Sequence, residues 1–227
     1  MGKLTIHVRS RAGIAFVTAT AALALTACGG GAKRADDGKI DGAEGSASAS
    51  ADPASPSPSG GPGGDGVERP KITLPDDVKH VFEPRSTGDA RQDAVLADNE
   101  RNIISEDDAI LRGDPRSTAL SFYNTGSALA GAVDWVKKFL DADLTLTGTT
   151  RYYNRHVKLD GDKKATLTYC GDESKAFNKN RKTGKVDRDE PSKDSYVLYN
   201  TRLVKSDKGV WQTTEMLSWR GSDSCQP

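Results

Sequence analysis

The 227-residue sequence has no excess charge and few histidines and cysteines. Lys plus Arg and Asp plus Glu both number 32, so the chain has no overall field that would attract nucleic acid or steer an anionic substrate. Its three histidines and three cysteines show no CxxC or HExxH spacing, which argues against a zinc site. GxSxG and P-loop motifs are also absent, and no dinucleotide-binding glycine motif follows a predicted strand. We therefore expect no cofactor, no metal and no nucleic-acid partner.

The chain also lacks an apolar run long enough for a transmembrane helix. The apolar part of the uncharged segment, within Ala12 to Ala27, is shorter than the roughly 20 residues that cross a bilayer. Lys3, Arg9 and Arg11 precede this stretch, as is typical of a secretory signal peptide. Because Ser10 separates the two arginines, the sequence predicts general secretion and not twin-arginine export.

The end of this stretch, Leu25-Thr26-Ala27-Cys28, resembles the bacterial lipoprotein box. The resemblance implies that residues 1–27 are removed and that Cys28 becomes a lipidated N-terminus. Two acyl chains hold a protein firmly on a membrane, whereas one does so only marginally. We therefore expect a lipid-anchored protein on the extracellular side of the cell membrane. The alternative is a plain signal peptide with Cys28 in a disulfide, and the small residues Thr26 and Ala27 favour the lipoprotein box.

Residues 28–66 consist mainly of Gly, Ser, Ala, Pro and Asp, with Ile40 as the one large apolar side chain. Such a segment cannot bury enough apolar surface to fold, and it is typical of a flexible linker. The remaining residues, 67–227, are sufficient for one domain with a sizeable core.

Two helices are expected ahead of the strands of this domain. Residues 89–112 repeat apolar side chains at spacings of three, four or seven, and the sequence Gly-Asp-Pro ends the pattern. The apolar residues of this helix are Ala90, Ala94, Ala97, Ile104 and Leu111. The second helix, within residues 125–143, has an apolar face made of Leu129, Val133, Val136 and Leu140, with Trp135 off that face.

The apolar period then changes to two. Four strands are expected at residues 144–159, 165–170, 196–205 and 210–219. Turns at Asp160-Gly161 and at residues 206–209 favour antiparallel pairing of sequence neighbours. The sequence thus predicts an α+β fold in which N-terminal helices pack on a strongly curved, antiparallel four-stranded sheet.

Five short motifs accompany these elements: RGDP (112–115), YNTGSAL (123–129), CGDES (170–174), KTGKV (182–186) and KGVWQTT (208–214). Together they resemble the nuclear transport factor 2-like domains seen in actinobacterial secreted lipoproteins. The resemblance implies a cone-shaped domain with a cavity between the helices and the sheet. The wider superfamily uses this cavity for isomerase or dehydratase chemistry, whereas most members of the lipoprotein group have no known activity.

Cys170 and Cys225 are the cysteines of the exported domain, an even pair in an oxidising compartment. We predict that they form a disulfide between a strand end and the C-terminal tail. A metal site is the alternative, with His80 and His156 as the histidines at hand.

Candidates for acid–base catalysis are Asp134, Tyr152, His156 and Tyr199. Alternation along a strand puts Tyr152, Asn154 and His156 on one face, so His156 can point inward or toward water. Because no nucleophile motif or paired carboxylates accompany them, we expect no enzymatic activity and no catalytic role for His156.

Binding is the favoured function. The candidate ligand cavity consists of Trp135, Tyr152, Tyr199 and Trp211, with Glu215 as a polar anchor and Trp219 as a further aromatic. The alternative is that these aromatics fill the core. A separate basic cluster, which can contact anionic wall polymer or lipid headgroups or remain a solvated loop, contains Lys175, Lys179, Arg181, Lys182, Lys185 and Arg188.

The sequence therefore predicts a membrane-anchored extracytoplasmic lipoprotein that acts as a non-catalytic accessory or binding module. Its expected partner is an envelope protein, a wall polymer or a small ligand. The alternatives are a protein-interaction adaptor at the cell envelope and an isomerase- or dehydratase-like cavity enzyme. A deep cavity with converging acid, histidine and tyrosine groups favours the enzyme, and a filled core with an exposed apolar patch favours the adaptor.

Overall fold

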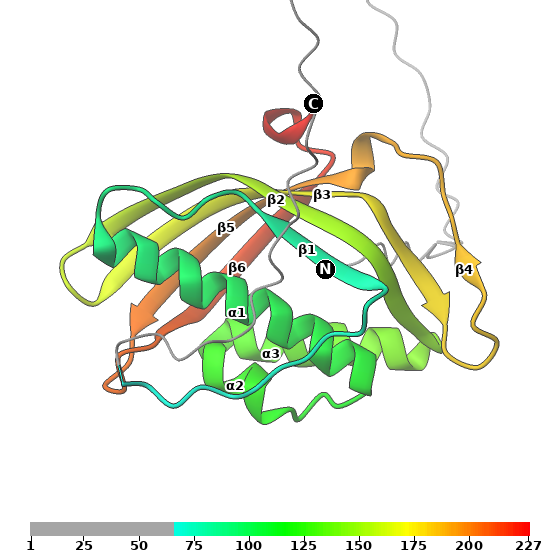
Figure 1. Ribbon diagram of the computed structural model, residues 1–227, viewed down its shortest axis with the longest axis horizontal. Coiled ribbons are helices and arrows are strands. Elements are labelled where there is room, and N and C mark those ends of the chain that lie inside the picture. The colour runs from blue at the N-terminus through cyan, green and yellow to red at the C-terminus, as the bar shows by residue number, and fades with distance from the viewer. Residues whose placement is uncertain (1–65) are drawn as a thin grey trace, which may run out of the picture. The chain divides into compact units, whose positions relative to one another are not determined.

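The computed structural model describes residues 66–227, which form two layers: a sheet, and three helices that cover one of its faces (Figure 1). The helices are α1 (Ala90–Arg112), α2 (Thr118–Tyr123) and α3 (Gly126–Asp141). The strands are β1 (Val78–Phe82), β2 (Leu144–Asp160), β3 (Lys164–Asn180), β4 (Val186–Asp187), β5 (Tyr196–Lys205) and β6 (Trp211–Arg220). Two single-turn 3-10 helices lie at Lys193–Ser195 and Asp223–Cys225. The fold is therefore of the expected α+β class.

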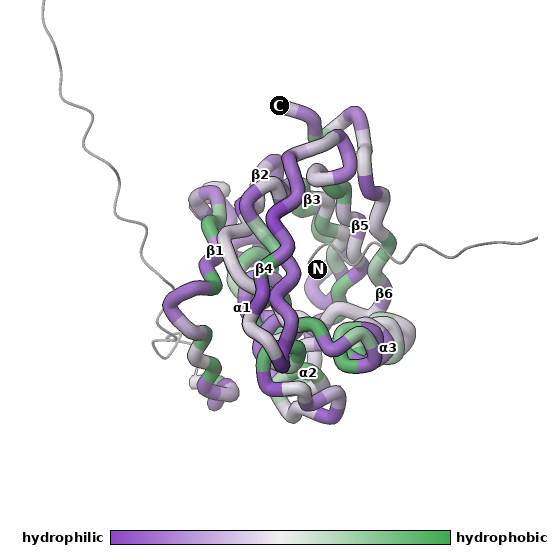
Figure 2. The backbone as a smooth tube through the Cα atoms, turned by 90° about the vertical axis from the view of Figure 1, so that its right-hand side faces the viewer, coloured by the Kyte–Doolittle hydropathy of each residue, from purple (hydrophilic) through white to green (hydrophobic). Residues whose placement is uncertain are grey.

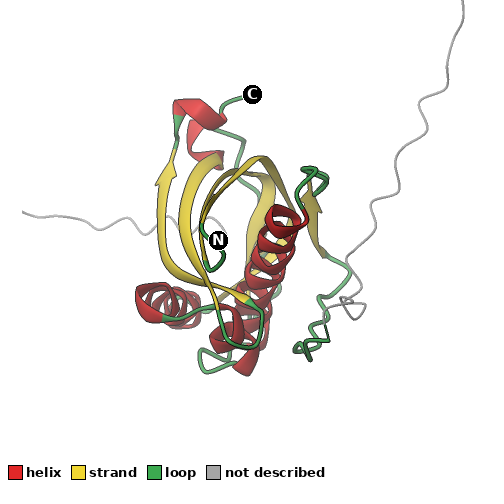
Figure 3. Ribbon diagram, turned by 90° about the vertical axis from the view of Figure 1, so that its left-hand side faces the viewer, coloured by secondary structure: helices red, strands yellow, loops and turns green. Residues whose placement is uncertain are grey.

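The six-stranded sheet is mixed, with the order β1-β2-β3-β5-β6 and with β4 paired to β3. The four predicted strands correspond to β2, β3, β5 and β6, and they pair antiparallel with their neighbours. The prediction of a four-stranded, purely antiparallel sheet was wrong, because β1 adds a parallel strand beside β2 and precedes the helices. This strand has five residues, and Lys79 and His80 interrupt its apolar pattern. In Figure 3 the strands arch over the helix layer.

Helix α1 begins and ends where the sequence predicts. The side chain of Asp89 accepts a hydrogen bond from the backbone N–H of Arg91 and caps the first turn. Gly113 ends the helix in the left-handed conformation, with φ of 70°, which favours glycine. The guanidinium of Arg181 donates to the carbonyls of Ile110 and Leu111 at the same end. One member of the predicted basic cluster is thus part of the fold.

Helix α3 is present as predicted, but its innermost face differs. Its fully buried residues are Ala128, Ala132, Val136 and Phe139. The predicted residues Leu129, Val133 and Leu140 are only partly buried and flank this face. The face is rotated because the small alanines, which carry little hydropathy signal, occupy the positions closest to the rest of the fold.

Apolar side chains form two main clusters. One joins the first half of α1 to the sheet and includes Val95, Leu96, Leu167, Leu203 and Trp211. The other joins the end of α1 to α2 and α3 and includes Ile110, Leu120, Val136 and Phe139. Both clusters depend on α1, which is the longest helix of the fold.

The predicted disulfide between Cys170 and Cys225 is present, with the two Cα atoms 5.6 Å apart, in the usual range for such a bridge. It holds the C-terminal turn against the outer face of the sheet, away from the helices. Tyr153 packs beside the bridge and donates its hydroxyl hydrogen to the carbonyl of Cys225.

None of the helices within residues 66–227 combines the length and apolar character needed to span a membrane. The predicted signal peptide, the lipid attachment site Cys28 and most of the predicted linker lie outside the described residues.

Replacing Cys170 by Ser should lower the free energy of unfolding by about 2–5 kcal/mol, because the bridge limits the freedom of the unfolded chain. Urea melts of Cys170→Ser, Cys225→Ser and the double variant should give the same loss, since each change removes the same bond. A double variant that loses the sum of the two single losses would show that the cysteines act independently.

Candidate functional site

Helix α1 buries an unusually large number of polar residues. Its buried polar residues are Asp98, Asn99, Glu100, Asn102, Ser105, Glu106, Asp107 and Asp108. Burial of a carboxylate is costly unless a partner compensates for the lost water. The partners of these acids therefore show how the interior is organised.

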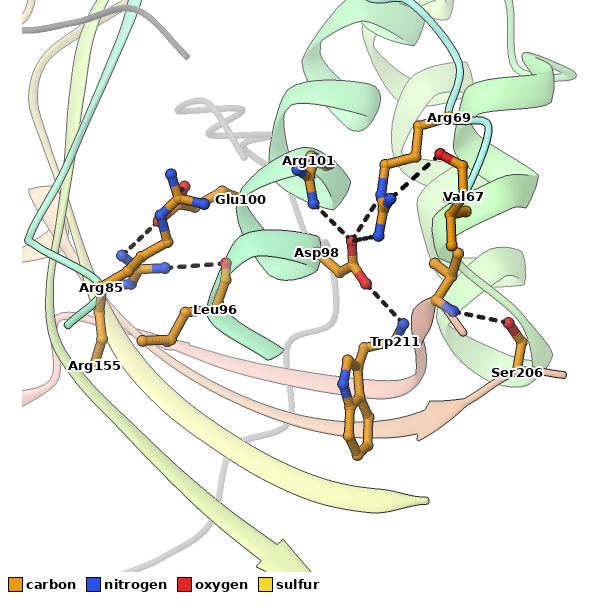
Figure 4. A network of polar contacts seen from close by, with 11 residues as sticks. Val67, Arg69, Arg85, Leu96, Asp98, Glu100, Arg101, Arg155, Ser206 and Trp211 are labelled. Atoms are coloured by element: carbon orange, nitrogen blue, oxygen red, sulfur yellow. Dashed lines mark hydrogen bonds and ion pairs between the residues drawn. The ribbon is translucent and has the colours of Figure 1, made fainter. Parts of the chain in front are cut away.

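Two of the acids are held by arginines (Figure 4). Asp98 accepts hydrogen bonds from Arg69 at 3.2 Å and Arg101 at 2.9 Å, and also from the backbone N–H of Trp211 at 2.9 Å. Glu100 lies 2.7 Å from a guanidinium nitrogen of Arg155, whose side chain is also buried. These contacts tie α1 to the segment before β1, to β2 and to β6.

A third acid pairs with a histidine of β1. The Nε2 atom of His80 lies 2.8 Å from Oδ2 of Asp107, and both side chains are buried. The Nδ1 atom of His80 and the Oδ1 atom of Asp107 have no hydrogen-bond partner within residues 66–227. A cavity of about 10 Å³, lined by this pair and by Thr147, Thr150 and Phe177 among others, reaches them from the β1–β2 side. That volume holds about one water molecule.

Glu106 differs from the other acids, because its partner in the structure is a neutral amide. The Nδ2 atom of Asn102 lies 3.5 Å from Oε1 of Glu106 and also donates to Thr213 at 3.2 Å. Burial, together with the negative charge of Asp107, raises the pKa of Glu106 to about 7, against the opposing effect of the Asn102 hydrogen bond.

Three tyrosines of the sheet complete the polar interior. The rings of Tyr169 and Tyr199 stack with centroids 4.8 Å apart, and Tyr152 meets Tyr169 edge-on at 6.1 Å. Burial raises the pKa of Tyr152 well above 10, and the charge of Asp107 adds to this effect. Gly171 makes room for the rings, since a Cβ atom there would lie 3.1 Å from Tyr199.

The far end of this row is closed by a buried carboxylate. Glu173 accepts hydrogen bonds from the hydroxyl of Tyr199 at 3.1 Å and from Arg220 at 2.8 Å. The interior thus contains acid, histidine and tyrosine groups that suit proton transfer, but side chains fill it. A substrate needs space beside the reacting groups, and the cavity at His80 and Asp107 has room for about one water molecule.

In contrast to the filled interior, large apolar side chains are exposed at β6, the outermost strand on the β5 side of the sheet. Leu217 is 61% exposed and Trp219 is 49% exposed, and they are two of the three large hydrophobic residues that are exposed in the described chain. Both lie on the outer face, where Trp219 is opposite Leu198 and Leu217 is opposite Asn200 on β5. We call the segment Met216–Arg220, with these two side chains, the edge patch. Figure 2 shows β6 at the margin of the sheet, with α3 below it.

The five residues predicted to form a ligand cavity do not come together. Tyr152, Tyr199 and Trp211 are buried in one apolar cluster, and Trp135 packs against Phe139 in the other. Glu215 is on the outer face, 3.5 Å from the exposed Arg202. The aromatics therefore fill the core, which was the alternative interpretation, and Glu215 anchors nothing inside.

His156 points toward water, one of the two orientations left open by the sequence, and the predicted alternation fails. The pairing of β2 with β3 shifts between Tyr153 and His156, where Asn154 adopts φ of 49°. This β-bulge moves His156 to the face opposite Tyr152. Asp134 is also exposed, on α3, 3.8 Å from Lys137. Of the acid–base residues predicted from the sequence, only Tyr152 and Tyr199 belong to the polar interior.

The basic cluster is largely neutralised. Lys179 pairs with Asp77 at 3.0 Å and Lys182 with Asp143 at 2.7 Å, and Lys185 is 3.9 Å from Asp187. The guanidinium of Arg181 donates hydrogen bonds to carbonyls at the end of α1. These pairs leave little net charge for an anionic polymer.

Sequence analysis missed Glu106 and Asp107 of the polar interior, and it considered His80 only as a possible metal ligand. The signal available in the sequence was the run of acidic residues from Asp98 to Asp108. Because these residues lie on all sides of the helix, some of them must be buried. Within residues 66–227, no group of three or more Asp, Glu, His or Cys side chains is arranged to hold a metal ion.

No protein-family model matches the chain, and no curated protein matches it. Among solved structures, a ketosteroid isomerase-like protein from Erwinia carotovora atroseptica SCRI1043 is 19% identical, with a TM-score of 0.37 over 56% of this chain and 96% of that chain. The intermembrane space region of the chloroplast protein ARC6 is 15% identical, with a TM-score of 0.34 over 56% of this chain and 96% of that chain. Similarities at this level carry no argument about this chain.

The high pKa of Glu106 makes the stability of the protein depend on pH. The folded state holds this proton up to about pH 7, whereas the unfolded chain releases it near 4.5. The stabilisation is therefore present below pH 4.5 and is lost as the pH rises to about 7. The stability of Glu106→Gln relative to the wild type should rise by roughly 3 kcal/mol over this range.

Urea melts at half-unit pH steps from 4.5 to 7.5 measure this difference. Glu215→Gln, which removes a carboxylate from the outer face, is the control for the loss of one charge. Parallel stability curves for Glu106→Gln and the wild type would contradict the assignment.

Proposed function

We propose that the chain is a lipid-anchored extracytoplasmic protein whose domain works as a protein-interaction module through the edge patch. One observation carries the proposal: the interior is filled, whereas two large apolar side chains lie side by side on an exposed strand. An exposed hydrophobic patch on a soluble domain is typical of an interaction site. Aromatic residues, such as Trp219, are enriched among those that dominate binding energy.

The anchor is supported by the sequence Leu25-Thr26-Ala27-Cys28 and by the Gly, Ser and Pro-rich segment that follows it. A tethered module gains from a high effective concentration at its membrane, so that a modest apolar patch suffices for binding. This arrangement favours a partner that is confined to the same envelope.

A second candidate function is proton transfer inside the domain. It is favoured by one observation, the pKa of about 7 at Glu106 beside the His80–Asp107 pair, because a general acid or base works best near the ambient pH. It requires the helix layer to open, because the cavity at His80 and Asp107 holds only about one water molecule.

Replacing Cys28 by Ser should abolish lipidation and leave an unprocessed precursor. Mass spectrometry of the membrane fraction measures the N-terminus, and the expected wild-type result is a peptide that begins at a diacylglyceryl-modified Cys28. Cys170→Ser is the control for the loss of a thiol. An unmodified mature N-terminus at another position would contradict the anchor.

Replacing Trp219 by Lys should dissociate the complexes of the protein in its membrane, because a charge enters the apolar contact. Native gel electrophoresis of solubilised membranes measures this as a loss of the higher-mass species. Val204→Lys is the matched control, since Val204 is a 39% exposed hydrophobic residue on the neighbouring strand, beside Gln212 and outside the edge patch.

Glu106→Gln separates the two candidate functions. Interaction through the edge patch predicts that this variant keeps both the complexes and the cellular phenotype, whereas Trp219→Lys loses both. A phenotype lost in Glu106→Gln and kept in Trp219→Lys, with both proteins folded, would contradict the interaction module and support proton transfer.

A further inference from the structure

We propose that the partner of the edge patch is a second copy of this chain, with the two β6 strands paired antiparallel about a two-fold axis at Ser218. The inference rests on the proposed function and names its partner. It is carried by the hydrogen-bond pattern of β6, by the covering of only half of its edge, by the fit of the strand to itself, and by the lack of protection of that edge.

The first argument is the direction of the backbone groups. The N–H of Gly221 donates to the carbonyl of Tyr196 at 2.8 Å, so positions 221, 219 and 217 direct their backbone groups toward β5. In an antiparallel pair the residues between them direct theirs away from the partner strand. Met216, Ser218 and Arg220 therefore present N–H and C=O groups at the outer edge of the sheet.

The second argument is that only half of this edge is covered. The start of α3 lies against the first half of β6, where Thr125 N–H donates to Thr213 O at 2.9 Å and the Ser127 hydroxyl donates to Thr214 O at 3.2 Å. No strand of residues 66–227 pairs with the second half, Met216–Arg220. An open edge of this kind is a template for pairing with another chain.

The third argument is the fit of the strand to a second copy. With the axis at Ser218, the two Ser218 residues form a hydrogen-bonded pair, and Met216 pairs with Arg220 of the second copy. Leu217 of each copy then faces Trp219 of the other copy on the outer face, so this contact occurs twice. Aromatic and aliphatic side chains in such cross-strand pairs stabilise a sheet, and no like charges face each other in this register.

The fourth argument is that the edge lacks protection. Monomeric proteins shield open edges with proline, lysine or a bulge. Met216–Arg220 contains no proline or lysine, and the bulge of the β5–β6 pair lies earlier, at Arg202 and Leu203. The guanidinium of Arg220 is turned to Glu173 and to the carbonyl of Asp194. Its charge is therefore directed away from the open edge and does not oppose pairing with another strand.

The test is a disulfide crosslink in the full-length protein in its own membrane. In the proposed pair the two Ser218 Cα atoms lie about 5.5 Å apart, which a disulfide spans. Ser218→Cys should give crosslinked dimer as the major species after mild oxidation. Thr214→Cys, on the same strand, is the matched control, because its two copies would be about 27 Å apart.

A second variant tests the same pairing without a new thiol. The N–H of Ser218 points to the open edge, so Ser218→Pro removes no bond to β5 and yet removes a donor of the proposed pair. When the Ser218→Pro chain is co-expressed in excess with Ser218→Cys protein, it should not be incorporated into dimers with the Ser218→Cys chain. Alone, it should run as a monomer on native gels while keeping a cooperative thermal unfolding transition, which shows that it is folded.

The outcomes separate the inference from the proposed function. Crosslinking at position 218, with none at 214, supports the second copy. Folded Ser218→Cys protein without a crosslink overturns the second copy. If Trp219→Lys still dissociates a complex in that case, the proposed function stands with another protein as partner; if it dissociates nothing, both fail.

Discussion

The acidic inner face of α1 is the constraint on which the rest of the structure depends. Each buried carboxylate needs a partner, and the partners come from different parts of the chain: Arg69 before β1, His80 on β1, and Arg155 on β2. Removing one partner of a buried ion pair costs about 3–5 kcal/mol, because the remaining charge is uncompensated. These pairs thereby fix the position of the helix relative to the sheet. Apolar packing alone specifies that position less strictly.

The same constraint closes the interior. Polar partners and three tyrosine rings occupy the space between α1 and the sheet, so that cavity volume is left for about one water molecule beside His80 and Asp107. Glu106 is the acid with only a neutral partner, and its raised pKa follows from that position. Large apolar side chains are exposed instead on β6. There the sheet ends in exposed Leu217 and Trp219, and only half of the strand is covered by α3.

Local patterns predicted much of the fold. The bounds of α1 and the span of β5 follow from local sequence patterns, and the Cys170–Cys225 bridge follows from the even pair of cysteines in the domain. The candidate site was harder to predict from the sequence, for four physical reasons. Polar residues occupy the buried face of α1, so hydropathy favoured Ala90 and Ala94, which are exposed. The bulge at Asn154 reverses the alternation of β2, and the parallel pairing of β1 joins residues far apart in the chain. Exposure of Trp219 depends on which strand forms the edge, which composition cannot specify.

Amide hydrogen exchange of β6 tests the central claim most directly, because it reports on the open edge of the unmodified protein. The account predicts that the amide of Ser218, which has no partner on β5, exchanges slowly in the membrane-anchored protein and becomes faster on dilution or in Trp219→Lys. The amide of Trp219, bonded to β5, should stay protected in both. Exchange of the Ser218 amide at the rate of an open strand, at every concentration, would contradict the account.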